Sequence, residues 1–93
     1  MRQFALRFLA CRRGKGGCGC PEVTIGLDGV CAVTDDAGTR TEFAGAGALR
    51  DALREGAAAA RSDGSARVGA CTMHLEEASA ALERVDAWIG SGA

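Results

Sequence analysis

Residues 21–43, PEVTIGLDGVCAVTDDAGTRTEF, decide the fold, because they hold the clearest strand and turn signals of the chain. The β-branched residues from Val23 to Ile25 predict a strand, since branched side chains suit an extended backbone. Asp28-Gly29 is the strongest hairpin signal, because glycine tolerates the positive φ of a tight turn. Residues 30–34 are then expected to return beside the first strand as its antiparallel partner.

The strand pattern extends on both sides of this hairpin. Residues 35–38, DDAG, predict a second turn, and residues 39–43 predict a third strand. In residues 2–10 apolar side chains occupy every second position from Phe4 to Phe8, which favours a strand over the alternative of a helix. We therefore predict a small three- to four-stranded antiparallel meander.

Two helices are expected after the meander. Residues 47–61 repeat apolar side chains at helical spacing, and residues 72–90 predict an amphipathic helix capped by Thr72 or Ser79. Residues 68–73 fit either a short strand or the lead-in to that last helix. The apolar stripe of the last helix is Leu75, Ala78, Leu82, Val85, Trp88 and Ile89. The whole chain of 93 residues is thus predicted to be a single α+β domain.

The core is expected to be small. Alanine supplies much of the 47% apolar share, and methyl-sized side chains bury little area each. A chain of this length also buries a smaller fraction of its surface than a large one does. A bound metal, a disulfide, a larger protein partner or a second copy in a homo-oligomer is therefore the expected supplement.

Charge is distributed unevenly along the chain. Residues 1–20, a predicted basic strand followed by a Gly/Cys loop, carry five Arg or Lys and no acid, whereas residues 21–93 carry six against twelve acids. The basic residues of the first segment are Arg2, Arg7, Arg12, Arg13 and Lys15. They could contact nucleic acid, but no aromatic residue is interleaved with them after Phe8, so base stacking is poorly supported. An acidic protein partner or a solvated basic end explains them equally well.

The segment MRQFALRFLAC briefly resembles an export signal, but Arg7 interrupts its apolar stretch and Arg12-Arg13 follow directly. No apolar run approaches the roughly 20 residues that a membrane-spanning helix needs. We therefore expect a cytoplasmic protein without membrane contact. In a reducing compartment cysteines act as thiols or metal ligands more often than as disulfides.

The five cysteines and the single histidine carry the most specific chemistry. Cys18 and Cys20 are two positions apart, with one residue between them, while Cys71 and His74 are three positions apart and share a face if their segment is helical. Together they would form a closed zinc site of three thiolates and one imidazole. Its predicted ligands are Cys18, Cys20, Cys71 and His74, with Cys11 or Cys31 as substitutes. The alternative is that Cys31 and Cys71 pack as small apolar side chains and that His74 lies on the surface.

A thiol redox protein using Cys18 and Cys20 is a further alternative. The neighbouring Arg12, Arg13 and Lys15 would lower a thiol pKa and increase the fraction of nucleophilic thiolate. A disulfide in so short a loop would be strained and easily reduced.

The sequence matches other common catalytic and phosphate-binding motifs poorly. The glycine-rich run 12–19 lacks the GxxxxGK[ST] pattern and precedes a predicted strand, where a phosphate loop precedes a helix. One histidine leaves few options for general acid–base catalysis, and no serine–histidine–acid set is identifiable. We therefore predict that the chain is not an enzyme.

Residues 17–53 resemble a known group of small proteins. The resemblance rests on Cys20-Pro21-Glu22-Val23, residues 29–35, Phe43, Leu49 and Leu53. Their order is similar to that in actinobacterial BldB-like proteins, which accompany helix-turn-helix regulators. The resemblance implies a bacterial β-meander protein that acts as a partner and not as an enzyme. The tryptophan-led stretch that often precedes the cysteine in that group is absent, and the segment from Cys71 onward has no counterpart. The leading prediction is a small accessory protein acting through a larger protein partner.

Overall fold

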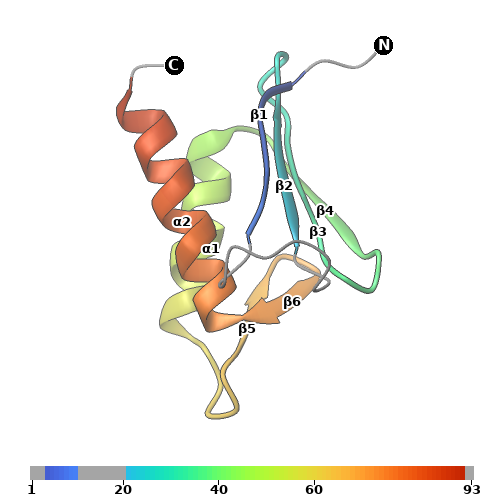
Figure 1. Cartoon of the computed structure of the whole chain (residues 1–93), viewed down its shortest axis with the longest axis vertical. Helices are drawn as coiled ribbons and strands as arrows, with labels where there is room; N and C mark the ends of the chain where they lie inside the picture. The colour runs from blue at the N-terminus through green and yellow to red at the C-terminus, as the bar shows by residue number, and fades with distance from the viewer. Residues whose placement is uncertain (1–3, 11–20, 92–93) are drawn as a thin grey trace.

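The computed structural model describes residues 4–10 and 21–91. Its elements in chain order are β1 (Phe4–Leu9), β2 (Glu22–Gly26), β3 (Cys31–Thr34), β4 (Arg40–Phe43), α1 (Ala46–Ala58), β5 (Ser65–Val68), β6 (Cys71–His74) and α2 (Leu75–Gly90). Figure 1 shows both helices on the same side of the four-stranded sheet. The predicted α+β fold is confirmed.

Strands β1 to β4 form one antiparallel sheet in chain order, and β5 and β6 form a separate hairpin (Figure 1). Both predicted turns of the meander are present. In the first, the Asp28 carboxylate accepts a hydrogen bond from the Val30 amide at 3.0 Å. In the second, the Asp35 carboxylate accepts from the amides of Ala37 and Thr39 at 3.0 and 2.9 Å. These bonds hold the strands in their registers.

Alternation along the paired strands gives the sheet an inner face, which meets the helices, and an outer face. The inner face consists of two cross-strand rows, Leu6–Ile25–Cys31–Phe43 and Phe8–Val23–Val33–Thr41. The central strands supply the deepest residues, because they have a neighbour on each side. Val23 and Val33 accordingly have no exposed surface.

Helix α1 spans Ala46–Ala58 and ends before the predicted limit at residue 61. It buries Leu49, Leu53 and Gly56 on one face, as their helical spacing predicted. The helix stops because the chain bends into the next turn, where the amide of Arg61 donates to the carbonyl oxygen of Ser65 at 2.8 Å.

The last helix begins later than predicted. Residues 71–74 belong to strand β6, because β5 pairs with all four of them and Cys71 and Met73 alternate into the core. The expected start of the helix at residue 72 is therefore wrong, and α2 begins at Leu75.

The predicted caps of α2, Thr72 and Ser79, are also wrong. His74 stands at the N-cap position, and its backbone amide donates to the Glu77 carboxylate at 2.8 Å. This bond satisfies an amide at the junction of strand and helix that would otherwise be left without a partner.

One apolar core joins the sheet, the hairpin and both helices. Its largest fully buried side chains are Val23, Ile25, Cys31, Val33, Leu49, Leu53, Val68, Cys71 and Val85. Helix α2 buries Ala78 and Ala81 beside Val85, so small side chains supply much of its contact. Among the helices of the described residues, none combines the length and the apolar character needed to cross a membrane.

Candidate functional site

Three of the predicted site cysteines, Cys11, Cys18 and Cys20, lie outside the described residues. Cys31 and Cys71 are free thiols with fully buried side chains. Each is the first residue of its strand and points into the core. Both positions agree with the alternative that these two cysteines pack as small apolar side chains.

Cys71 lies where β6 meets the turn between β3 and β4. Its Sγ is 3.3 Å from the carbonyl oxygen of Val33 and 3.2 Å from that of Thr39, so the thiol can donate a weak hydrogen bond. Beside it, the Asp35 carboxylate accepts from the amide of Thr72 at 3.3 Å. These contacts join the hairpin to the four-stranded sheet and keep the Cys71 thiol away from solvent.

Cys71 and His74 do not share a face. Residues three apart on a strand point to opposite sides, and Cys71 is buried whereas His74 is exposed. The helical spacing assumed for this pair is wrong. Within residues 4–10 and 21–91, no three His, Cys, Asp or Glu side chains gather as a potential metal site. A zinc site that includes Cys18 and Cys20 stays a prediction.

Burial raises the pKa of the Cys31 thiol, and the Asp28 carboxylate raises it further. Because the thiolate is the nucleophile, we expect iodoacetamide to modify Cys31 slowly in the folded protein at about pH 8 and much faster in denaturant. The folded-state rate should rise only at a pH above that at which an ordinary thiol ionises. Mass spectrometry of the peptide containing Cys31 measures both rates, and equal rates in folded and denatured protein would contradict the prediction.

An open groove of about 320 Å³ lies between strand β1 and helix α2. Its lining is Phe8, Leu9 and Ala10 on one side and Ala80, Glu83, Arg84 and Ala87 on the other. The four helix residues share one face, because they recur at intervals of three and four. Two of them are alanines, which leave room beside the strand, while Glu83 and Arg84 supply charge.

Strand β1 is an edge of the sheet, so half of its backbone groups point away from β2. The amide of Ala10 donates to the carbonyl oxygen of Pro21 at 2.8 Å, and bonded residues alternate along an antiparallel pair. Phe8 therefore bonds to β2, whereas the N–H and C=O groups of Arg7 and Leu9 point outward. In the part of the chain that the structure describes, no backbone group pairs with them.

A β-bulge at Ala5 shifts the start of this edge strand. Phe4 pairs with Gly26 and Leu6 pairs with Ile25, so β1 contains one residue more than β2 over this interval. The extra residue moves Phe4 to the outer face, although Leu6 remains on the inner face with Ile25.

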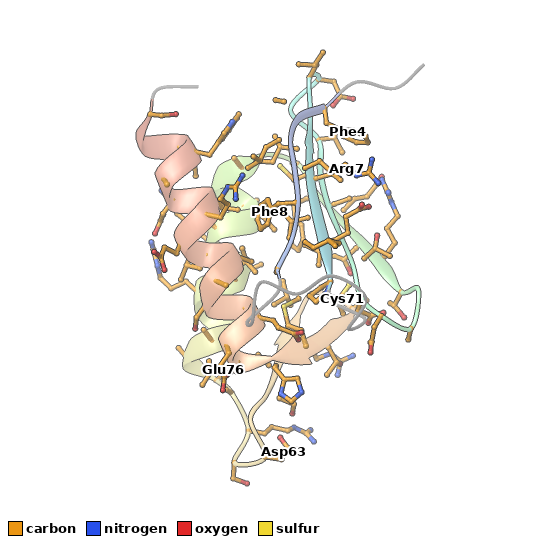
Figure 2. The ribbon with its side chains drawn as sticks, viewed as in Figure 1. Phe4, Arg7, Phe8, Asp63, Cys71 and Glu76 are labelled. Carbon is orange, nitrogen blue, oxygen red and sulfur yellow. The ribbon has the colours of Figure 1, made fainter. Side chains whose placement is uncertain are left out.

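The outer face of β1 is aromatic and charged. The guanidinium carbon of Arg7 lies 5.8 Å from the ring centre of Phe4, and its Nε lies 2.8 Å from Glu22 Oε2. Figure 2 shows Phe4 and Arg7 on the side of β1 away from the helices, whereas Phe8 points toward the helices. The two sides of β1 therefore offer different chemistry.

On the helix side, Arg84 lies over the ring of Phe8, with 5.1 Å between the guanidinium carbon and the ring centre. This is a cation–π contact. Arg7 is paired with Glu22, but Arg84 has no ion-pair partner among the residues that the structure describes. Its guanidinium therefore lies at the groove, over the Phe8 ring.

No protein-family model, curated protein or solved structure matches this chain. The resemblance of residues 17–53 to BldB-like proteins stays a prediction.

The described lining of the groove carries one acid and one base. Glu83 and Arg84 are the ionisable residues among the described residues that line it, and no Cys, His, Ser or Thr is present there. Sequence reasoning missed the groove. The small residues Ala80 and Ala87 were its only local signal, and nothing in the sequence placed them beside β1.

Of the residues predicted to contact nucleic acid, Arg7 lies on the outer face of β1, where Glu22 already neutralises part of its charge. The others, Arg2, Arg12, Arg13 and Lys15, lie outside the described residues. Nucleic-acid binding through this set stays a prediction.

Proposed function

We propose that this chain is a non-enzymatic cytoplasmic accessory protein that binds an extended segment of a larger protein partner. The segment lies against the outward edge of β1, in the groove that α2 completes. The observation that carries the proposal is the combination of an edge strand with a groove beside it.

An extended segment can join a sheet as an additional strand, because its backbone hydrogen-bonds to an edge strand while alternate side chains enter pockets. The outward N–H and C=O groups of Arg7 and Leu9 offer up to four such bonds. Residues 6–9 pair with β2 without irregularity, so their outward groups are regularly spaced. The groove then receives the side chains of the segment that face α2.

The exposure of Leu9 also supports a partner at this edge. This residue is 50% exposed next to the groove, and a strand added beside β1 would cover part of it. The small core adds a general reason, since a chain with few bulky buried residues gains stability from a bound partner. A role as a partner protein is also what the resemblance to BldB-like proteins implies.

Leu9→Pro tests the proposal, because proline removes an outward-pointing amide and leaves the Phe8 bonds to β2 in place. We expect this variant to bind the natural partner at least about tenfold more weakly than the unmodified chain, since a donor is lost and the proline ring obstructs the edge. Affinity purification from the source cells, followed by titration of the recovered partner, measures the change.

Glu42→Pro is the matched control. Glu42 lies on the opposite edge strand, β4, and in the register its amide also points away from the sheet. Glu42→Pro should bind the partner as the unmodified chain does. In the unmodified chain, hydrogen exchange of the Arg7 and Leu9 amides should slow when the partner binds. Equal binding by the unmodified chain and Leu9→Pro, with both variants folded by circular dichroism, would overturn the proposal.

A further inference from the structure

We propose that the outer face of the β5–β6 hairpin binds the phosphate group of a soluble small molecule between Arg61 and Arg67. The site is separate from the groove beside β1 and does not depend on the proposed function. It is a recess of about 210 Å³. Its described lining contains two bases and no acid: Ala59, Arg61, Ser65, Ala66, Arg67 and Thr72.

Alternation along the hairpin brings the polar lining to one face. Ala66 and Val68 of β5 are buried in the core, so Ser65 and Arg67 point to the opposite side. Thr72 of β6 pairs with Arg67 and is exposed on the same outer face. The guanidinium of Arg67 therefore leaves the hairpin on the face that carries the Thr72 hydroxyl.

The backbone of Arg61 is fixed beside β5. Its amide donates to the carbonyl oxygen of Ser65 at 2.8 Å, and its carbonyl oxygen accepts from the Gly64 amide at 2.9 Å. Gly64 closes this turn with φ 87, a conformation that favours glycine. The second guanidinium thus extends from an ordered turn, which reduces the entropy that ligand binding has to remove.

Direct ion pairs do not neutralise the two guanidiniums. Among the residues that the structure describes, neither Arg61 nor Arg67 forms a salt bridge. Glu55 and Arg67 line a neighbouring groove, but they are not paired with each other. The hydrogen bonds from Ser65 lower the pKa of Asp63, and the charge of Arg61 lowers it further. Asp63 therefore offsets part of the charge of Arg61.

The two hydroxyls of the recess have different roles. Ser65 donates its hydroxyl to Asp63 Oδ1 at 2.7 Å, so this hydroxyl is already engaged. The amide of Thr72 donates to the Asp35 carboxylate at 3.3 Å, but its hydroxyl has no hydrogen-bond partner within the described part of the chain. Thr72 is therefore the hydroxyl that remains to donate to a ligand.

These donors suit a phosphate group. Guanidinium forks donate parallel pairs of hydrogen bonds, and phosphate has enough oxygens to accept from two forks and a hydroxyl. Membrane surfaces are typically recognised by clusters of about four to eight basic residues, whereas the described lining of this recess contains two. A phosphate in solution therefore fits the recess better than a lipid headgroup does.

The test is a titration of the whole chain with inorganic phosphate, followed by nuclear magnetic resonance of the backbone amides. Sodium chloride is adjusted to keep the ionic strength constant. We expect the amides of Arg61, Ser65, Arg67 and Thr72 to shift and saturate together. Chloride alone should not produce these shifts.

Arg61→Gln and Arg67→Gln should each weaken phosphate binding by about threefold or more, and the double variant by about tenfold or more. Arg54→Gln is the matched control, because it removes the same charge from an exposed arginine that lies 3.9 Å from Asp51 on α1. It should change the affinity by less than about twofold. All these variants should keep the circular dichroism spectrum of the unmodified chain.

Asp63→Asn supplies a change of opposite sign. The asparagine oxygen can still accept the hydrogen bonds from Ser65, while the negative charge beside Arg61 is removed. This variant should bind phosphate about twofold more tightly or better. Thr72→Val removes the hydroxyl and keeps the branched shape, so it should weaken binding by about twofold or more.

Three results would overturn the proposal. The first is equal weakening by Arg54→Gln and by the two recess substitutions, which would indicate a general charge effect. The second is a set of shifts that grow linearly and spread over all exposed arginines. The third is sedimentation with phosphatidic acid vesicles in the absence of any binding to inorganic phosphate, which would assign the arginines to a membrane surface.

Discussion

Replacing Gly69 by alanine should destabilise the protein by about 2 to 5 kcal/mol, the sum of a backbone cost and an overpacking cost. Gly69 has φ 61, a left-handed conformation that residues with a Cβ disfavour. An added Cβ would also overlap the methyl group of Thr41 and lie 3.0 Å from its Cβ and Oγ1. Thr41 cannot rotate away freely, because its Oγ1 accepts a hydrogen bond from the Ala70 amide at 2.8 Å. Urea denaturation measures the loss.

Two further variants separate these costs. Gly38 has φ 88 with nothing within 4 Å of an added Cβ, so Gly38→Ala should show only the backbone cost of about 1 to 2 kcal/mol. Thr41→Ser removes the methyl group and keeps the hydroxyl, so it should recover part of the stability lost in Gly69→Ala. If the losses of unfolding free energy caused by Gly69→Ala and Thr41→Ser are additive in a double-mutant cycle, the steric explanation is wrong.

Gly56→Ala should also destabilise the protein, by about 1 to 2 kcal/mol, although alanine is the better helix former. A Cβ at Gly56 would lie 2.5 Å from the carbonyl oxygen of Arg67 and 3.1 Å from Cγ2 of Val68. Both atoms belong to β5, and one is backbone, so α1 would have to move away from the hairpin. The gain in helix propensity, up to about 1 kcal/mol, is smaller than the expected cost of that movement.

Gly47→Ala is the matched control in the same helix. Nothing lies within 4 Å of an added Cβ there, so this variant should be as stable as the parent or more stable by up to about 1 kcal/mol. If Gly56→Ala lowers the free energy of unfolding and Gly47→Ala raises it, then close packing, and not helix propensity, requires glycine at position 56. A stabilising effect of Gly56→Ala in thermal and urea unfolding would contradict this account.

The meander could be predicted because its signals are local. Asp28 and Asp35 each bond to amides within four residues, and the glycines that follow them have positive φ. The alternation of Phe4, Leu6 and Phe8 similarly predicted β1. The bulge at Ala5 was not foreseen, because the sequence of residues 4–6 does not show that Phe4 pairs with Gly26.

The start of α2 could not be predicted with the same success, because residues 71–74 suit a strand or a helix. Pairing with β5 decides for the strand, and that pairing is a tertiary contact with little local signal. The error had a chemical consequence: it placed Cys71 and His74 on one face and suggested a shared metal. The need for glycine at position 56 could not be predicted from the helix alone either, because it depends on β5, which lies further along the chain.

The bulge at Ala5 also shortens the regular edge of β1. A long regular edge can recruit strand after strand and lead to fibrils. Beside β1 the regular hydrogen-bonding positions end at Leu6, because the extra residue displaces the backbone groups that follow toward the N-terminus. The regular part of the β1 edge is therefore short, and short or bulged edges are one way in which native sheets discourage edge-to-edge association.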